Sequence, residues 1–300
     1  MSNRQPLKAR RDLMSALNVA VVQLTSTEDI ANNVDRILEI ANEFPDEVDL
    51  ICLPENALFF RISKTQKMPS IALSDPQLLR LKEFVDSRNM AMMVGSIPFR
   101  DDAKVNRPFN ATVFLRPGKN PEVVYRKIHL FDVDVPGAPA VCESETFHHG
   151  PESAIIEWKG WKIGLSICYD IRFAELYNQY GLQNVDLILI PSAFLVPTGK
   201  AHWDILVRSR AIENQCFVVA AAQGGEHVSA SGEKRHTYGH SMVVGPWGER
   251  IVELNDEQDW GVTKIDKSEI AQTRARIPMK QHRLKRNWVC RPPGTKEGEV

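Results

Sequence analysis

The sequence is poor in cysteine, and its cysteines are not arranged for cross-linking. There are five, an odd number, and no CxxC pair occurs among them. A chain of 300 residues can enclose a core large enough to fold without disulfide bonds. We therefore expect reduced thiols and a cytoplasmic protein, because free cysteines are typical of a reducing compartment.

An excess of one charge is also missing. The chain has 37 Lys and Arg against 38 Asp and Glu, which gives a formal net charge of -1. Nucleic acids and acidic membranes are bound by strongly basic surfaces, so we expect neither as a partner. The longest apolar runs, such as 185–196, contain Pro191 and fall short of the ~20 residues of a membrane helix. A small molecule is the expected partner.

Motifs for metals and phosphates are absent as well. Histidines are paired at 148–149 and at 236 and 240, but neither pair has a carboxylate or cysteine in a ligand pattern, and no HExxH occurs. No glycine-rich stretch matches a phosphate-binding loop. We therefore expect no metal and no bound nucleotide.

The composition, 43% hydrophobic and 25% charged, is typical of a soluble globular protein. Because no linker or repeat divides the chain, we predict one domain over 17–285. Residues 1–16 contain four basic side chains before any strand-like pattern and are predicted to be a flexible leader, with organellar targeting as the less favoured alternative. Residues 286–300, rich in proline and glycine, are predicted to be a tail.

Short apolar runs, typical of strands covered on both faces, recur along the chain. They lie at 19–24, 50–53, 91–97, 111–115, 163–167, 187–190, 217–221 and 241–244. Helical spacing follows capping candidates at Ser26 and Thr27, and follows Asp75-Pro76; two further helices are expected after Cys168 and Gly199. Residues 111–115 and 123–128 flank a Pro-Gly turn and predict an antiparallel pair. An α/β sandwich with mixed sheets follows.

Cys168 ends an apolar strand and precedes a helical stripe. At a helix N-terminus the free amides and the dipole would favour its thiolate, so it is a candidate nucleophile, although a buried structural thiol fits its position equally well. Ser166 begins a G-x-S pattern, but Cys168 replaces the second glycine that a serine elbow needs. We therefore interpret Ser166 as a packing residue.

Two charged positions, one after a predicted strand and one within a predicted strand, leave their roles open. Glu55 closes the strand 50–53 beside Phe59 and Phe60, which would wall a pocket around a general base, yet carboxylates at strand ends are often only solvated. Lys127 lies in a strand where a lysine often only protects a sheet edge. A catalytic lysine needs a carboxylate partner, and Glu143 or the neighbouring Glu145 would supply one.

Taken together, Leu53-Pro54-Glu55, the stretch 125–131 around Lys127 and the stretch 164–173 around Cys168 resemble the signatures of the nitrilase, or carbon-nitrogen hydrolase, superfamily. The resemblance covers roughly 17–283, and the three signatures occur in the family's order. It implies a carbon-nitrogen hydrolase domain folded as an α-β-β-α sandwich of the nitrilase type. It also implies a homodimer, or a larger oligomer built from dimers, in which two sandwiches stack into four layers.

The same resemblance assigns roles residue by residue. It implies that Cys168 is the nucleophile, Glu55 the general base and Lys127 the positive charge beside the tetrahedral intermediate. Glu143 matches a second acidic position of many members better than Glu145 does. No cofactor is implied, and an intact set of these groups argues against a non-catalytic scaffold on the same fold.

Substrate recognition is less sharply defined. The backbone amide of Tyr169 is a candidate oxyanion donor, and Arg172 and Thr198 are candidates for binding a substrate carboxylate. For Arg172 we favour the alternative of a structural ion pair with Asp170 or Glu175, because residues three apart on a helix are neighbours.

Within the family, residues 221–225 and 238–248 resemble the amidases of deaminated glutathione (2-oxoglutaramyl-Cys-Gly) most closely. The ω-amidases of 2-oxoglutaramate and 2-oxosuccinamate are near neighbours, and hydrolases of N-carbamoyl amines are a further alternative. The implied reaction is hydrolysis of a small, carboxylate-bearing linear amide through a cysteine thioester.

Overall fold

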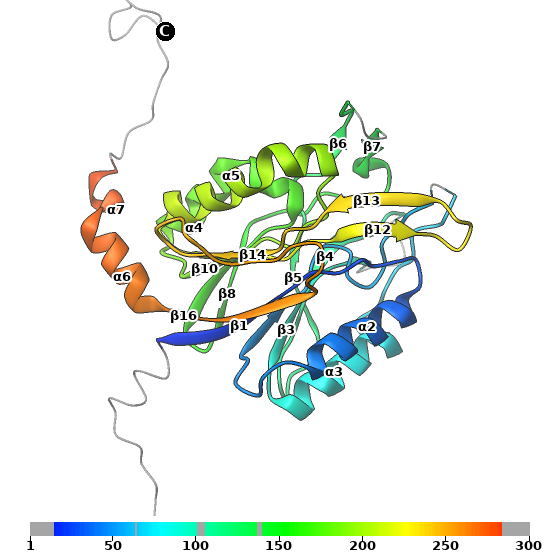
Figure 1. Ribbon diagram of the computed structural model, residues 1–300, viewed down its shortest axis with the longest axis horizontal. Helices are drawn as coiled ribbons and strands as arrows, with labels where there is room; N and C mark the ends of the chain where they lie inside the picture. Colours follow the sequence, from blue (N-terminus) through cyan, green and yellow to red (C-terminus); the bar gives the residue numbers. More distant parts are fainter. Residues whose placement is uncertain (1–14, 64, 101–105, 137–139, 284–300) are drawn as a thin grey trace, which may run out of the picture.

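The computed structural model describes residues 15–63, 65–100, 106–136 and 140–283. The predicted tail, and all of the predicted leader except its last two residues, lie outside this part. Two six-stranded sheets carry the fold (Figure 1). The first has the order β16 (Trp260–Asp266), β1 (Ala16–Val22), β2 (Leu50–Cys52), β3 (Ala91–Phe99), β4 (Phe109–Leu115), β5 (Glu122–Arg126). The second has the order β15 (Arg250–Glu253), β14 (Met242–Val244), β11 (Phe217–Ala220), β10 (Leu187–Leu189), β9 (Trp161–Leu165), β8 (Ala154–Trp158).

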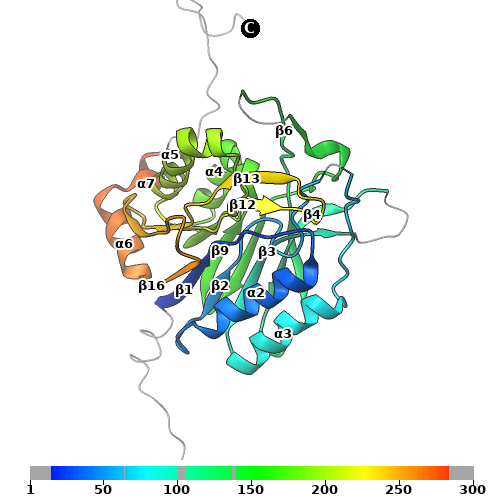
Figure 2. The ribbon, with the colours of Figure 1, turned by 45° about the vertical axis from the view of Figure 1, so that its right-hand side comes forward.

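Helices cover the outer face of each sheet. In Figures 1 and 2, α2 (Ile30–Asn42) and α3 (Pro76–Arg88) lie on one side of the sheets, and α4 (Ala174–Leu182) and α5 (Val196–Asn214) lie on the other. The C-terminal helices α6 (Lys267–Arg276) and α7 (Met279–His282) follow β16. The described part of the chain is therefore an α-β-β-α sandwich with mixed parallel and antiparallel pairing, as predicted.

Strand β1 shows how the sequence produces these layers. Leu17, Val19 and Val21 belong to the core shared by both sheets and by α4 and α5, whereas Ala20 and Val22 belong to the core under α2 and α3. Successive side chains of a strand point to opposite faces, so an uninterrupted apolar run serves two cores at once.

Each of the eight predicted strands corresponds to a strand of the structure, and the predicted antiparallel pair is β4 with β5. The helix boundaries differ in detail. The N-cap of α2 is Asp29, because Ser26 and Thr27 are engaged with Ala57 and Asn33 instead.

Two helices also begin at other residues than expected. Helix α5 starts at Val196, ahead of Gly199, with proline in its first turn. The chain after Cys168 forms a short 3-10 helix, Cys168–Arg172, before α4 begins at Ala174.

The topology brings the ends of three strands together. Glu55 follows β2, Lys127 follows β5, and Cys168 follows β9. Beside them lie a hairpin of β12 (Gly224–Val228) and β13 (Lys234–Tyr238), and a small pair of β6 (Asp132–Val133) and β7 (Val141–Cys142) that leads into the 3-10 turn Glu143–Glu145. Among the described residues, no helix is long and apolar enough to cross a membrane.

Candidate active site

A cavity of about 720 Å³ lies at these strand ends. Its lining includes Glu55, Lys127, Glu143 and Cys168, so the structure brings together the four residues that the sequence singled out as reactive. Glu145 also lines the cavity, but it is Glu143 that contacts Lys127.

The lysine lies between two carboxylates. Lys127 Nζ donates to Glu55 Oε1 and to Glu143 Oε2, each at 2.8 Å, and its side chain is only 2% exposed. Burial alone lowers the pKa of Lys127, but the two carboxylates outweigh burial and raise it well above its usual range. Lys127 therefore carries a permanent positive charge in the cavity wall.

Asn110, on β4, completes this cluster from the buried side. Its Nδ2 donates to Glu55 Oε1 at 2.9 Å and to Glu143 Oε1 at 3.0 Å. The backbone amide of Phe131 donates to Glu143 Oε2 at 2.7 Å. Each carboxylate is thus held by donors from β4 and from the segment that follows β5, which fixes both of them around the ammonium group of Lys127.

Cys168 is held in an unusual backbone conformation. Its φ is +48°, in the left-handed region, and its amide donates to Pro191 O at 2.8 Å. Non-glycine residues rarely adopt such a φ because Cβ crowds the backbone. The sharp turn brings Cys168 to the cavity wall, which Glu55 and Ala193 also line.

The predicted preference for thiolate is wrong for the resting site. Burial raises the pKa of Cys168 well above its usual range and Glu55 raises it further, against the opposing effect of Lys127. The 3-10 turn after Cys168 is only five residues long and supplies little of the dipole that the sequence suggested. The thiol keeps its proton, so its reactivity requires a base.

Asp170 joins the nucleophile turn to the strand that leads to Lys127. The fully buried carboxylate accepts from the hydroxyl of Tyr125 on β5 at 2.8 Å and from the amide of Ile167 at 2.9 Å. It also accepts from the amide of His129 at 2.9 Å. These bonds fix the position of Cys168 relative to Lys127.

The predicted substrate-binding residues are not among those that line the cavity. Tyr169 packs against Phe131 and Phe173. Arg172 is hydrogen-bonded to His202 at 3.2 Å and pairs with neither Asp170 nor Glu175 in the described chain. Thr198 donates to a backbone carbonyl in the first turn of α5.

Phe59 and Phe60, which the sequence predicted beside the general base, do not line the cavity either. Both are buried, and Phe60 stacks on His227 of β12 with ring centroids 4.1 Å apart. Ser166 is buried and bonded to Leu189 and Tyr177, in agreement with the packing role predicted for it.

Two arginines line the cavity that sequence reasoning did not single out. Arg61 follows the Phe59-Phe60 segment, and Arg235 lies on β13, about 67 residues beyond the nucleophile along the printed sequence. The only local signal was the position of Arg61 six residues after Glu55. Arg235 becomes a cavity residue solely through the fold of the β12–β13 hairpin.

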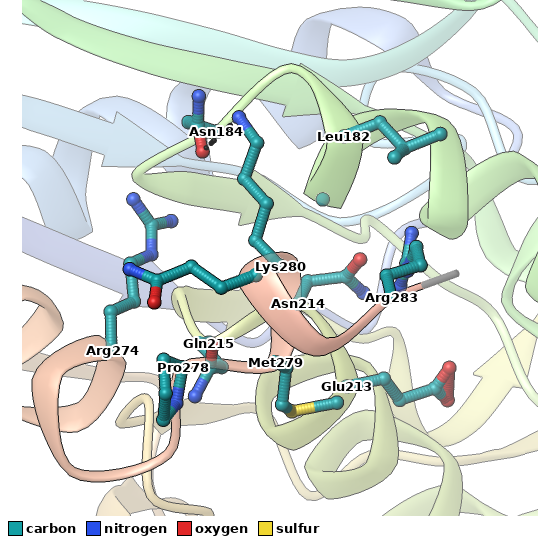
Figure 3. Close-up of a pocket in the computed structure, with 12 residues that line it drawn as sticks. Leu182, Asn184, Glu213, Asn214, Gln215, Arg274, Pro278, Met279, Lys280 and Arg283 are labelled. Carbon is teal, nitrogen blue, oxygen red and sulfur yellow. Dashed lines mark hydrogen bonds between the residues drawn. The ribbon is translucent and has the colours of Figure 1, made fainter. Parts of the chain in front are cut away.

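A second, smaller cavity of about 200 Å³ lies between the α4–β10 region and α6–α7 (Figure 3). Lys280 reaches across it to Asn184 Oδ1 at 2.9 Å. None of the 12 residues drawn around it is a cysteine or a histidine. Among the described residues, no group of three or more His, Cys, Asp or Glu side chains is placed to hold a metal ion.

Comparison with known proteins agrees with this geometry. A model of the carbon-nitrogen hydrolase family matches residues 18–275. The chain belongs to the carbon-nitrogen hydrolase family. It is accordingly a mixed α/β hydrolase that acts on carbon-nitrogen bonds.

Several relatives of this carbon-nitrogen hydrolase are named as amidases. Human deaminated glutathione amidase is 37% identical over 274 residues, which cover 88% of this chain and 81% of that protein. The omega-amidase NIT2 of Xenopus tropicalis is 33% identical over 90% of this chain and 96% of its own length.

A solved relative has the same fold. The NitFhit protein of C. elegans is 34% identical, with a TM-score of 0.80, over 90% of this chain and 65% of its own.

Proposed function

We propose that this enzyme hydrolyses a small linear amide that carries a carboxylate, through a thioester on Cys168. Deaminated glutathione is the first candidate substrate, because relatives in several organisms carry that activity in their names. The observation that carries the proposal is a single cavity in which Cys168 adjoins a hydrogen-bonded Lys127 and Glu55. The ω-amidase reaction is the second candidate, since NIT2 is a relative of similar identity.

In the proposed reaction, Glu55 takes the proton of the Cys168 thiol as the sulfur bonds to the amide carbonyl carbon. A base is required because the thiol is protonated at rest. The oxyanion that forms is stabilised by the charge of Lys127 and by a backbone amide, for which Tyr169 is our candidate. Glu143 holds Lys127 in place from its other side.

The intermediate then collapses as the carbon-nitrogen bond breaks. The proton on Glu55 passes to the nitrogen, and the amine or ammonia leaves. Water attacks the thioester and gives a proton to Glu55; when the carbon-sulfur bond breaks, this proton returns to the sulfur and the acid is released. The steps balance without a cofactor, so we propose that none is used.

The test is a side-by-side assay of deaminated glutathione, 2-oxoglutaramate and an N-carbamoyl amine. We expect the first to give the highest kcat/KM, with stoichiometric alkylation of Cys168 by iodoacetamide abolishing turnover. A strong preference for the N-carbamoyl amine would overturn the proposed substrate. Turnover that survives Cys168→Ala would overturn the mechanism, and no turnover of any amide would favour a scaffold.

We also propose that the protein is a cytoplasmic homodimer, or a larger oligomer built from dimers. All four described cysteines are free, which suits a reducing compartment. Ile205 and Ile212 on α5 and Trp247 beside them are 64%, 45% and 55% exposed, a patch that a second copy would cover. Sedimentation analysis of the protein and of Ile205→Glu tests this: a dimer that dissociates supports it, and a wild-type monomer refutes it.

A further inference from the structure

Arg61 and Arg235 place two positive charges in the wall of the catalytic cavity. Arg61 donates to Thr146 Oγ1 at 3.2 Å, and Arg235 donates to the backbone oxygen of Arg61 at 3.0 Å. The guanidinium of Arg235 lies 4.6 Å from the centre of the Phe60 ring. These neutral contacts hold both side chains in position and leave further N–H donors on each.

Neither guanidinium makes an ion pair with any described residue. The other cations of the cavity wall are neutralised, since Lys127 lies between two carboxylates and Lys234 pairs with Glu226 at 2.7 Å. Arg61 and Arg235 also line this cavity, but neither has a carboxylate partner in the described chain.

The two charges also act on each other. Burial lowers the pKa of Arg235, and the charge of Arg61 lowers it further, while the carboxylates of Glu55 and Glu143 raise it. Holding two cations together in a partly desolvated wall is unfavourable, and an anion beside both relieves their repulsion. Guanidinium groups bind carboxylates with paired hydrogen bonds, so a carboxylate is the anion that fits.

We propose that Arg61 and Arg235 form a subsite for a substrate carboxylate, apart from the amide that Cys168 attacks. This inference rests on the proposed amidase function and deepens it. The cavity of about 720 Å³ has room for a molecule that reaches from the sulfur to the arginines. Arg172, the candidate from sequence, does not line that cavity.

The experiment measures recognition without turnover. N-(iodoacetyl)glycine and its neutral amide carry the same alkylating group, and only the first has a carboxylate a few atoms away. The measured quantity is the ratio of the alkylation rate with the acid to the rate with the amide. We expect this ratio for Cys168 of the full chain to exceed the ratio for free glutathione by about 10- to 100-fold, because charged hydrogen bonds contribute about 1.5–3 kcal/mol. Mass spectrometry of the Cys168 peptide gives both rates.

Variants locate the subsite. Arg61→Gln and Arg235→Gln should each reduce the ratio at least about fivefold, because each removes one of the two guanidiniums. Lys234→Gln is the matched control, since it removes the same charge from the same wall but from a residue already paired with Glu226. An unchanged rate with the neutral reagent shows that the site remains folded.

Equal acid and amide rates in the wild type would overturn the inference, even if amidase assays succeed. An equal loss of the ratio in Lys234→Gln would also overturn it, because general charge rather than a subsite would then be responsible. A ratio that depends on both arginines, in a protein that hydrolyses no amide, would support the subsite and refute the proposed function.

Discussion

The two ends of the cavity differ in whether their positively charged side chains have carboxylate partners. At the reacting end, the charge of Lys127 has two carboxylate partners, Glu55 and Glu143, each at 2.8 Å. At the other end, Arg61 and Arg235 have no carboxylate partner in the described chain. A charge that has a built-in partner is fixed and serves the reaction, whereas a charge without one is available to a ligand.

We call the end with Lys127, Glu55 and Glu143 the paired end, and the end with the two arginines the unpaired end. Loss of the ion pairs at the paired end should have the largest effect. Lys127→Met removes the proposed oxyanion charge and leaves Glu55 and Glu143 buried without their cation. We expect kcat/KM to fall by about 10²- to 10³-fold, the usual cost of losing one oxyanion donor. Steady-state kinetics on the best amide measures this, with circular dichroism to confirm folding. A folded variant that keeps more than a tenth of the activity would contradict the role given to Lys127.

At the unpaired end, Arg235 packs on the ring of Phe60, which is stacked on His227. Acid should weaken this stack. His227 lies under Phe60, and burial lowers its pKa to about 4 from 6.5. The unfolded chain therefore binds this proton between pH 6.5 and 4 while the folded chain does not. We expect the free energy of unfolding to fall through that window by about 3 kcal/mol and to level off below it.

Urea unfolding from pH 7 to pH 4 tests the prediction. The control is His227→Phe, which keeps an aromatic ring on Phe60 but has no proton to bind. If the wild type and this variant lose stability in parallel over the whole window, His227 is not the responsible group.

A smaller loss of activity is expected from a substitution of Asn110 at the paired end. Asn110→Leu removes a donor shared by Glu55 and Glu143 but leaves Lys127 in place. We expect about a tenfold loss of kcat/KM, since hydrogen bonds to charged groups contribute about 1.5–3 kcal/mol. The acid limb of the pH–rate profile should also move to higher pH, because less donor capacity then opposes protonation of the cluster.

Thr112→Val is the matched control, because Thr112 is another buried polar residue of β4 that bonds only to a backbone carbonyl, Gly95 O at 3.0 Å. An identical pH profile for Asn110→Leu and the wild type would make Asn110 a packing residue only.

The sequence predicted the paired end better than the unpaired end, and the reason is physical. Glu55 and Cys168 each follow an apolar strand and Lys127 lies at the end of a predicted one, and a strand is a local pattern that can be recognised along the chain. Their convergence was indicated by family resemblance. Asn110 lies inside a strand and carries no such mark.

Arg235 was beyond sequence reasoning because its place depends on how the β12–β13 hairpin packs against Phe60. The protonation of Cys168 was missed for a related reason. The sequence indicates that a helix follows the cysteine, but its pKa is raised by burial in the folded chain and by Glu55, which lies more than a hundred residues earlier in the sequence.

The left-handed backbone of Cys168 bears on which residue suits this position. At a φ of +48°, the crowding of Cβ costs on the order of 1 kcal/mol, and glycine is the residue that escapes this cost. The residue with the least backbone strain at this position is therefore glycine, which has no sulfur. A glycine here would relieve the crowding but would lack the thiol that the proposed reaction needs, so the position trades backbone stability for a sulfur atom.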